Sequence, residues 1–177
     1  VRAGDGQPLF SFYQPGFYYF VQLIHQAVPS LQTSLRISVL LLWWIAAGFT
    51  FLLLKRFGTL PPGAGAVCLA FSPYLILDVF VRSAYPELAG IAFGIGSLWA
   101  LDQWLRDARP WSLPVLAVLL ALLAVSHPPT TLIFSPVLAG YALVLLVTRE
   151  TTLKRLVLLA PAVLLGIGIA AFYLVPA

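Results

Sequence analysis

Two acids and one base lie close together in a chain that is otherwise strongly apolar. The segment 78–87 reads DVFVRSAYPE and contains Asp78, Arg82 and Glu87. Asp78 and Arg82 are four residues apart, so on a helix they lie one turn apart on the same face and can form an ion pair. Glu87 follows Pro86 and opens the next apolar run. This segment is therefore the first candidate for a polar site.

Arg82 has the chemistry to bind an anionic phosphate, because its planar guanidinium matches phosphate oxygens. Asp78 would then orient Arg82 or contact a sugar hydroxyl, and it is the candidate catalytic residue, whereas Glu87 is a candidate for substrate binding. The alternative for Asp78 and Arg82 is an ion pair that only makes a charged helix end tolerable near lipid. The alternative for Glu87 is that it only belongs to an ordinary helix start, with Pro86 and an acid in the first turn.

His127 and two tyrosines complete the set of candidate substrate-binding residues. His127 stands in the sequence SHPPT between two apolar runs. Its imidazole can donate to a phosphate or transfer a proton near neutral pH, and a histidine that only caps the following helix is the alternative. Tyr13 and Tyr85 are candidates for substrate contact, and anchoring at the membrane surface is their alternative role.

A metal site is not predicted from the protein residues alone. The two histidines and scattered acids show no H-x-x-x-H or E-x-x-H spacing, and Cys68 is the only cysteine. Asp5, Asp78 and Glu87 nevertheless offer oxygen ligands to a divalent cation that is held together with phosphates. The expected cofactor is therefore none, or a divalent cation shared with the substrate.

The composition identifies the class of protein that must position these residues. The apolar fraction is 61% and the charged fraction 9%, against roughly 45–50% and about 25% in soluble domains. The chain is therefore expected to be a membrane protein whose partner is the lipid bilayer. Its net charge of +4 does not imply nucleic acid, because basic residues of membrane proteins collect in cytoplasmic loops.

The apolar runs predict an all-α membrane bundle. A span needs about 20 mainly apolar residues, and six segments approach or meet this length: 34–54, 61–80, 86–105, 111–126, 129–148 and 154–175. Residues 1–33 are too polar to span and read as an aromatic-rich loop with a short interfacial helix, 16–27. Two regions follow: the loop 1–33 and a transmembrane bundle 34–177.

The basic residues predict the orientation of the bundle. Seven of the ten lie in alternating loops, namely Lys55, Arg56, Arg106, Arg109, Arg149, Lys154 and Arg155. The positive-inside rule makes these loops cytoplasmic. Residues 1–33, 81–86 and 126–129 then share the extracytoplasmic face, so the segment 78–87 and His127 are expected at the same end of the bundle.

Four sequence blocks resemble those of a known family of bacterial membrane proteins. The blocks are GDGQPLFSFYQPGFYY, AFSPYLILDVFVRSAYPEL, LAVSHPPTTL and AFYLVPA. In this order they resemble the 6-pyruvoyl-tetrahydropterin synthase-related membrane proteins, whose layout is similar to that of GT-C type glycosyltransferases. The similarity covers most of the chain, and the second block is its most specific part. Pterin chemistry is not implied, because soluble pterin synthases hold zinc with three histidines and this chain has two.

The resemblance to GT-C enzymes implies a function at the extracytoplasmic face of the bacterial inner membrane. It implies transfer of a sugar from a polyprenyl-phosphate donor, with inversion at the anomeric carbon and an acid as general base. Arg82 and His127 would bind the donor phosphate, and Tyr13, Tyr18 and Tyr19 would shape the entrance. The principal acid of such enzymes lies in the first extracytoplasmic loop. Asp5 cannot be matched to it, so the base stays unassigned.

Two other function classes remain open. A transporter or flippase for a lipid-linked or anionic solute would use Asp78 and Arg82 along its route, and a membrane assembly scaffold would need no substrate. The chain has no Met, begins at VRAGDGQP and ends at LVPA, where an apolar run finishes. We therefore expect a piece of a longer protein with further helices upstream.

Overall fold

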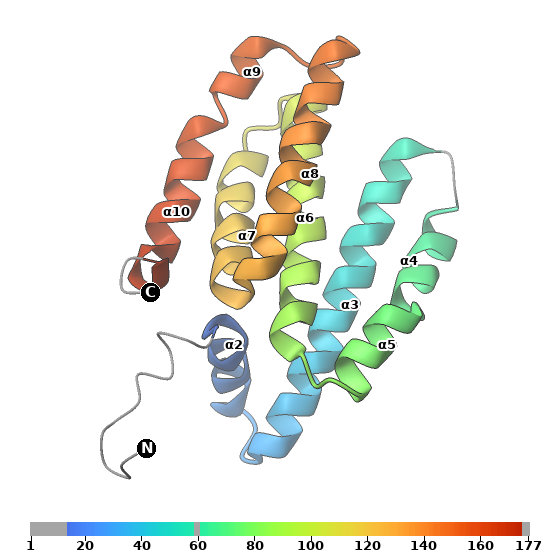
Figure 1. The fold of residues 1–177 in the computed structure, drawn as a ribbon, viewed down its shortest axis with the longest axis vertical. Coiled ribbons are helices and arrows are strands. Elements are labelled where there is room, and N and C mark those ends of the chain that lie inside the picture. Colours follow the sequence, from blue (N-terminus) through green and yellow to red (C-terminus); the bar gives the residue numbers. More distant parts are fainter. Residues whose placement is uncertain (1–13, 59–60, 175–177) are drawn as a thin grey trace.

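The computed structural model describes residues 14–58 and 61–174, and this part of the chain is helical without any strand. The helices are α2 (Gly16–His25), α3 (Leu31–Phe57), α4 (Pro62–Ala70), α5 (Pro73–Phe80), α6 (Tyr85–Asp107), α7 (Ser112–Ser126), α8 (Pro128–Val147), α9 (Leu153–Val157) and α10 (Ala160–Leu174). Figure 1 shows most of them running roughly along one direction. The prediction of an all-α membrane protein is confirmed for the described residues.

Five helical stretches of the described chain are long and apolar enough to cross a membrane. They are Leu31–Phe57, Pro62–Phe80, Tyr85–Asp107, Pro128–Val147 and Leu153–Leu174, and they correspond to five of the six predicted segments. The remaining segment, 111–126, is helix α7, and its 15 residues fall short of the roughly 20 that a span requires. The structure thus supports five candidate membrane-spanning helices.

Two of these stretches are broken near a proline. Pro73 begins α5, and the hydroxyl of Ser72 caps this helix by accepting the N–H of Leu75 at 3.3 Å. The last stretch divides between Val157 and Ala160, just before Pro161. Proline has no N–H to donate to the preceding turn, so each break falls where the helical hydrogen bonds would be interrupted. The break before Pro73 ends α4 and sets α5 at an angle in Figure 1.

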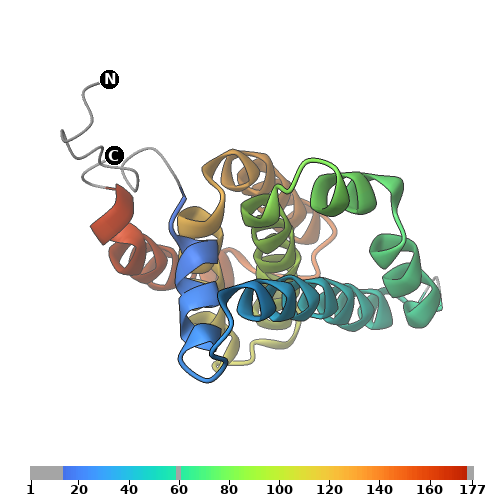
Figure 2. The same cartoon turned by 90° about the horizontal axis from the view of Figure 1, so that it is seen from below.

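Helix α6 lies at the centre of the bundle. In an apolar 18-residue stretch of α6, 78% of the residues are buried, against 11% in the corresponding stretch of α8. Figure 2 shows neighbouring helices around α6. Gly90 and Gly94 allow the close approach of α8. A Cβ atom at Gly90 would lie 3.0 Å from Cβ of His127, and one at Gly94 would lie 2.6 Å from the ring of Phe134. The G-x-x-x-G spacing on α6 therefore serves helix packing, and it fixes the position of His127.

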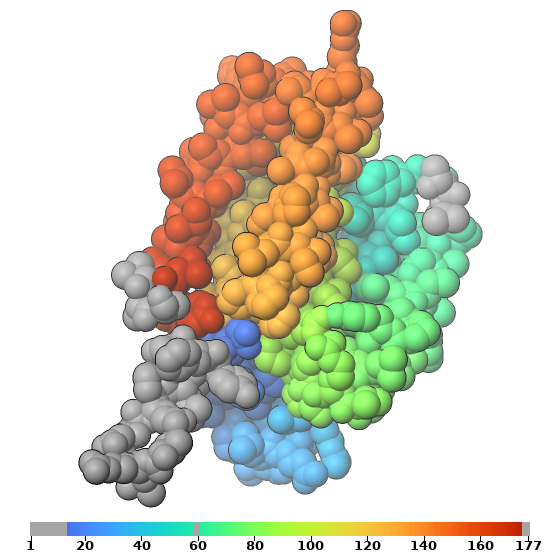
Figure 3. Space-filling model, in the orientation of Figure 1, coloured from blue at the N-terminus to red at the C-terminus, as the bar shows by residue number. Residues whose placement is uncertain are grey.

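The two ends of the bundle carry different connections. The α5–α6 and α7–α8 connections lie at the same end as α2, and we call this the site end. The opposite end, here the basic end, carries the α3–α4, α6–α7 and α8–α9 connections (Figure 1). Figure 3 shows α8 lying across the surface of the bundle between the two ends. The alternation of loops predicted from the basic residues agrees with this arrangement.

Candidate functional site

Asp78, Arg82 and Glu87 form one ion-pair cluster at the site end. Nη1 of Arg82 donates to Oδ1 of Asp78 at 2.8 Å and lies 3.3 Å from Oε2 of Glu87. The side chain of Asp78 is fully buried, that of Glu87 is 13% exposed, and that of Arg82 is 56% exposed. The two acids therefore hold one side of a guanidinium whose outer part is accessible.

The backbone between α5 and α6 brings these residues together. The N–H of Arg82 donates to the carbonyl of Leu77 at 2.9 Å, and the N–H of Ala84 donates to the carbonyl of Asp78 at 2.9 Å. Ser83 adopts a positive φ of 53°, a conformation that non-glycine residues seldom adopt. This tight turn reverses the chain, so that Glu87 in the first turn of α6 faces the end of α5.

Tyr74 is a fourth member of the cluster that the sequence did not indicate. Its hydroxyl hydrogen-bonds Oε1 of Glu87. Tyr74 precedes Asp78 by four residues on α5, and this spacing places both side chains on the same helix face. The hydroxyl of Tyr74, followed by the carboxylates of Glu87 and Asp78, raises the pKa of Arg82. The guanidinium therefore stays fully charged.

One oxygen of Asp78 has no partner in the described part of the chain. Oδ2 is buried and accepts no hydrogen bond from residues 14–58 or 61–174. A buried carboxylate oxygen without a donor is costly, so the cluster has an acceptor suited to a hydroxyl or a cation. This atom distinguishes the cluster from a simple surface ion pair.

His127 lies next to the cluster and caps α8. Its Nδ1 accepts the backbone N–H of Thr130 at 3.3 Å and lies 2.6 Å from the Thr130 hydroxyl. A backbone N–H can only donate, so Nδ1 is the acceptor and the neutral ring carries its proton on Nε2. Burial lowers the pKa of His127, Glu87 raises it, and Arg82 lowers it, with a net decrease. The imidazole is therefore neutral at pH 7.

In the described structure Tyr85, Tyr18 and Tyr19 pack against aromatic rings of α2 and α10. The ring of Tyr85 packs against Phe17 of α2, with centroids 5.5 Å apart. The ring of Tyr19 packs against Phe172 of α10 at 6.4 Å, and Tyr18 packs edge-on against Phe17 at 5.7 Å. Tyr13 lies outside the described residues. These aromatic contacts join α2 to α6 and α10 beside the cluster.

A second polar cluster lies at the basic end, where the sequence had not suggested one. Asp102 of α6 is fully buried and accepts from Nε of Arg56 at 2.7 Å and from the hydroxyl of Tyr141 at 2.5 Å. Nε of Arg106 lies 2.8 Å from Oδ1 of the same carboxylate. Arg106 also pairs with Glu150. One carboxylate thus joins α3, α6 and α8.

The second cluster has a sequence signature that resembles the first. Asp102 precedes Arg106 by four residues, as Asp78 precedes Arg82. In contrast with Asp78, both oxygens of Asp102 are paired. The Nη1 atom of Arg155 adds bonds to the carbonyls of Leu105 and Arg106 at 2.7 and 2.8 Å. A fully paired cluster of this kind indicates a structural role.

Replacing Asp102 with alanine is expected to destabilise the bundle by about 3 kcal/mol, because Arg56 and Arg106 lose their shared partner. The measurement is unfolding in detergent, followed by helical circular dichroism. Asp107→Ala is the matched control, since Asp107 is 30% exposed where it pairs with Arg56, and its loss should cost less than about 1 kcal/mol. Equal stability of Asp102→Ala and the unmodified protein would contradict the structural role.

The described residues do not hold a metal site of their own. Within residues 14–58 and 61–174 there is no group of three or more His, Cys, Asp or Glu side chains close enough to bind one ion. Asp78 and Glu87 offer two carboxylates around the shared Arg82. Two carboxylates fit a cation that takes its remaining ligands from phosphates and water.

Comparison with known proteins agrees with the membrane fold. Residues 10–177 match the model of a family described as "6-pyruvoyl-tetrahydropterin synthase related domain; membrane protein". No curated protein and no solved structure matches the chain. The matched range includes both polar clusters and all the described helices. The chain therefore belongs to the family of 6-pyruvoyl-tetrahydropterin synthase related membrane proteins.

Proposed function

We propose that this protein transfers a sugar from a polyprenyl-phosphate donor at the extracytoplasmic face of the bacterial inner membrane. In this proposal the site end is extracytoplasmic, because the basic end carries most of the Lys and Arg residues. Helix α7 serves as a sixth, short span, and the bundle has a GT-C-like layout. The segment 1–33 would be extracytoplasmic, with α2 at the membrane interface.

The observation that carries the proposal is the pairing of a buried Asp78 with an exposed Arg82. Oδ1 of Asp78 holds the guanidinium, while Oδ2 is buried without a donor from the described residues. A phosphorylated sugar offers the two groups that this pair lacks: an anion for the guanidinium and a hydroxyl for the carboxylate. In a simple ion pair at a helix end, the guanidinium would not need a further anion and the carboxylate would not need a further hydroxyl.

Arg82 would bind the donor phosphate through N–H groups that its acids do not use. Both ion pairs involve Nη1, and a guanidinium has five N–H donors in a planar fork. Phosphate oxygens accept two of them in parallel, a geometry that adds specificity as well as energy. Neutral His127 would donate Nε2–H to the same phosphate, since its Nδ1 is already an acceptor for Thr130.

The charge of the cluster bears on phosphate binding. The formal charges of Asp78, Glu87 and Arg82 sum to a net negative charge beside a neutral imidazole, and this charge would repel a phosphate. A divalent cation held by Glu87 and the phosphate would supply the positive charge that the cluster lacks, and Oδ2 of Asp78 would stay available to the acceptor hydroxyl. Transfer assays of this protein should therefore contain Mg²⁺.

Asp78 is the proposed general base. In an inverting transfer, the acceptor hydroxyl oxygen bonds to the anomeric carbon while the bond from that carbon to the phosphate oxygen breaks. The phosphate keeps the electron pair and stays on the lipid, and the hydroxyl proton passes to Oδ2 of Asp78. Arg82, held by Oδ1, would stabilise the negative charge on the leaving phosphate. Glu87 and Tyr74 would keep Arg82 in place.

Replacing His127 separates its two possible roles. The variant His127→Asn should preserve the cap, because asparagine is among the preferred N-cap residues, whereas His127→Ala should lose about 1 kcal/mol of stability. Both variants should lower transfer about 10–100-fold, because each loses the Nε2–H donor to a charged phosphate. Transfer rates and unfolding midpoints in detergent provide the measurements. Normal transfer by His127→Asn would show that the residue is only a cap.

The experiment that tests the proposal is a transfer assay in reconstituted vesicles. Purified protein would be combined with a polyprenyl-phosphate sugar, Mg²⁺ and a mixture of hydroxyl acceptors, and loss of sugar from the lipid would be followed by mass spectrometry. Release of polyprenyl phosphate with appearance of a glycosylated acceptor is the expected result. Without such turnover for any sugar tested, the enzymatic proposal fails.

Thiol labelling decides between the enzyme and the transporter or flippase. Single cysteines at positions 78, 82 and 127 would be labelled from each side of the membrane after replacement of Cys68. An enzyme with a site at one face should react only from that face, whereas a transport route should react from both. Unchanged cellular function after simultaneous loss of Asp78, Arg82 and His127 would instead favour an assembly scaffold.

A further inference from the structure

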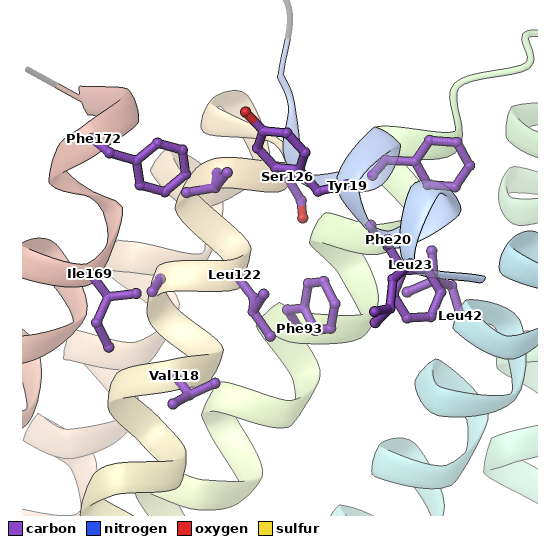
Figure 4. A pocket seen from close by; sticks show the side chains of 15 residues that line it. Tyr19, Phe20, Leu23, Leu42, Phe93, Val118, Leu122, Ser126, Ile169 and Phe172 are labelled. Atoms are coloured by element: carbon purple, nitrogen blue, oxygen red, sulfur yellow. The ribbon is translucent and has the colours of Figure 1, made fainter. Parts of the chain in front are cut away.

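An apolar cavity of about 380 Å³ lies between α2, α6, α7 and α10. Figure 4 shows Ile169 and Phe172 of α10 on one side and Phe20 and Leu23 of α2 on the other. The lining also includes Gly16 and Tyr19 of α2, Ala89 of α6, and Val118 and Ser126 of α7. Its volume is in the range of small-molecule sites, which extends from about 300 to 1,000 Å³.

The chemistry of the lining is that of a hydrocarbon site. Apart from the hydroxyls of Ser126 and Tyr19, the side chains around the cavity are aliphatic or aromatic. Ile169 of α10 is 44% exposed and Val118 of α7 is 47% exposed, so the side of the cavity formed by these two helices is open to the surroundings of the bundle. In a membrane protein this opening faces the hydrocarbon of the bilayer, from which an apolar chain can enter sideways.

The cavity lies beside His127, which borders the polar cluster at the site end. Ser126 lines the cavity, and the next residue is His127. On α6, Ala89 lines the cavity, while Glu87 belongs to the cluster and Gly90 packs against His127. Gly16 of α2 also packs on Ser126, since a Cβ there would lie 2.7 Å from its hydroxyl oxygen. An anionic head and an apolar chain thus have adjacent places.

We propose that this cavity binds part of the hydrocarbon chain of the lipid whose phosphate lies at Arg82. The identity of the phosphate-bearing head rests on the proposed function, whereas the chain site rests on the cavity alone. A second copy of the protein fits this space less well, because stable protein interfaces bury about 800 Å² per partner. A single flexible chain matches both the small volume and the lateral opening.

A photoreactive lipid tests the chain site. A polyprenyl phosphate with a diazirine on an isoprene unit close to the phosphate would be reconstituted with the full protein and irradiated, and the labelled sites would be mapped by peptide mass spectrometry. We expect labelling of the cavity-lining parts of α7 and α10. Ile169→Trp should lower this labelling about tenfold by filling the cavity. Ile167→Trp is the matched control, because Ile167 is 54% exposed on α10 and points about 160° away from Ile169.

The outcomes separate the chain site from the proposed function. The same labelling would be done with photoreactive polyprenol, which lacks the phosphate. If both lipids label the cavity and Ile169→Trp lowers the labelling, the chain site is supported even if no sugar is transferred. Sugar transfer with label spread evenly over all exposed helix faces overturns the chain site and leaves the proposed function intact. The variant Ile169→Cys gives a further outcome. If it forms disulfide-linked dimers and the lipid does not label the cavity, the cavity is an interface between copies and the chain site is overturned.

Discussion

Replacing Arg82 with alanine is expected to lower sugar transfer by about 100-fold or more, because the charged, forked donor of the phosphate is lost. The side chain is 56% exposed and lies outside the helices, so the bundle should still fold. The measurement is the initial rate of transfer at saturating acceptor, with expression and helical circular dichroism checked in parallel. Arg82→Lys should recover only part of the rate, since an ammonium ion lacks the planar fork.

Two variants control for indirect effects of the Arg82 change. Arg36→Ala removes an exposed arginine of α3 and should leave transfer unchanged. Arg82→Ala alone leaves the buried carboxylate of Asp78 without its partner. The double variant Asp78→Asn with Arg82→Ala removes this charge, so any loss of stability caused only by the unpaired carboxylate should be reversed. Near-normal turnover in Arg82→Ala would remove Arg82 from the mechanism.

Replacing Asp78 with asparagine is expected to lower the transfer rate about 10²–10⁴-fold, because an amide cannot take the acceptor proton. Asparagine keeps the size of the side chain and an oxygen that can accept from Arg82, so the donor phosphate should still bind. The comparison is between the rate of transfer and the affinity for polyprenyl phosphate in the same preparation. A large loss of rate with little loss of affinity would identify Asp78 as the base.

Glu87→Gln provides the matched control for Asp78→Asn. Glu87 also contacts Arg82, but at 3.3 Å, and it has a second partner in Tyr74. It should therefore lose about tenfold in transfer, as expected for one weakened hydrogen bond to a charged group. If Glu87→Gln loses the most and Asp78→Asn stays within tenfold of the unmodified protein, the proposed base is the wrong carboxylate.

The helical architecture could be predicted from the sequence because a bilayer allows few alternatives. Backbone groups in hydrocarbon must be satisfied within the segment, so each long apolar run had to be a helix. The break at Pro73 follows from the N–H that proline lacks. The split between Val157 and Ala160 was not predicted, because run length alone does not show where a helix is interrupted. The shortness of α7 was visible in the sequence, since the segment 111–126 already fell short of about 20 residues.

The candidate site was partly predictable. The spacing of Asp78 and Arg82 predicted the pair that the structure contains, and the alternation of loops placed His127 at the same end. Tyr74 was missed because a tyrosine in an apolar run reads as a membrane-interface anchor. Its distance of four residues from Asp78 was the available indication. The roles of all these residues in a reaction remain predictions.

Asp102 shows why sequence spacing alone does not identify a functional site. Its distance from Arg106 is the same as that of Asp78 from Arg82, yet its partners Arg56 and Tyr141 come from two other helices. Tertiary contacts of this kind cannot be inferred from a single sequence. They satisfy both oxygens of Asp102, whereas Oδ2 of Asp78 accepts no bond from the described residues. The difference between the clusters lies in packing.

The most direct test of the central claim is the preference of the protein for a phosphate on its lipid. Binding of polyprenyl phosphate and of polyprenol to the reconstituted protein would be compared in Mg²⁺, for the unmodified chain and for Arg82→Ala. We expect the unmodified protein to bind the phosphate form at least about tenfold more tightly, and Arg82→Ala to lose most of this preference. An undiminished preference for the phosphate in Arg82→Ala would contradict the account.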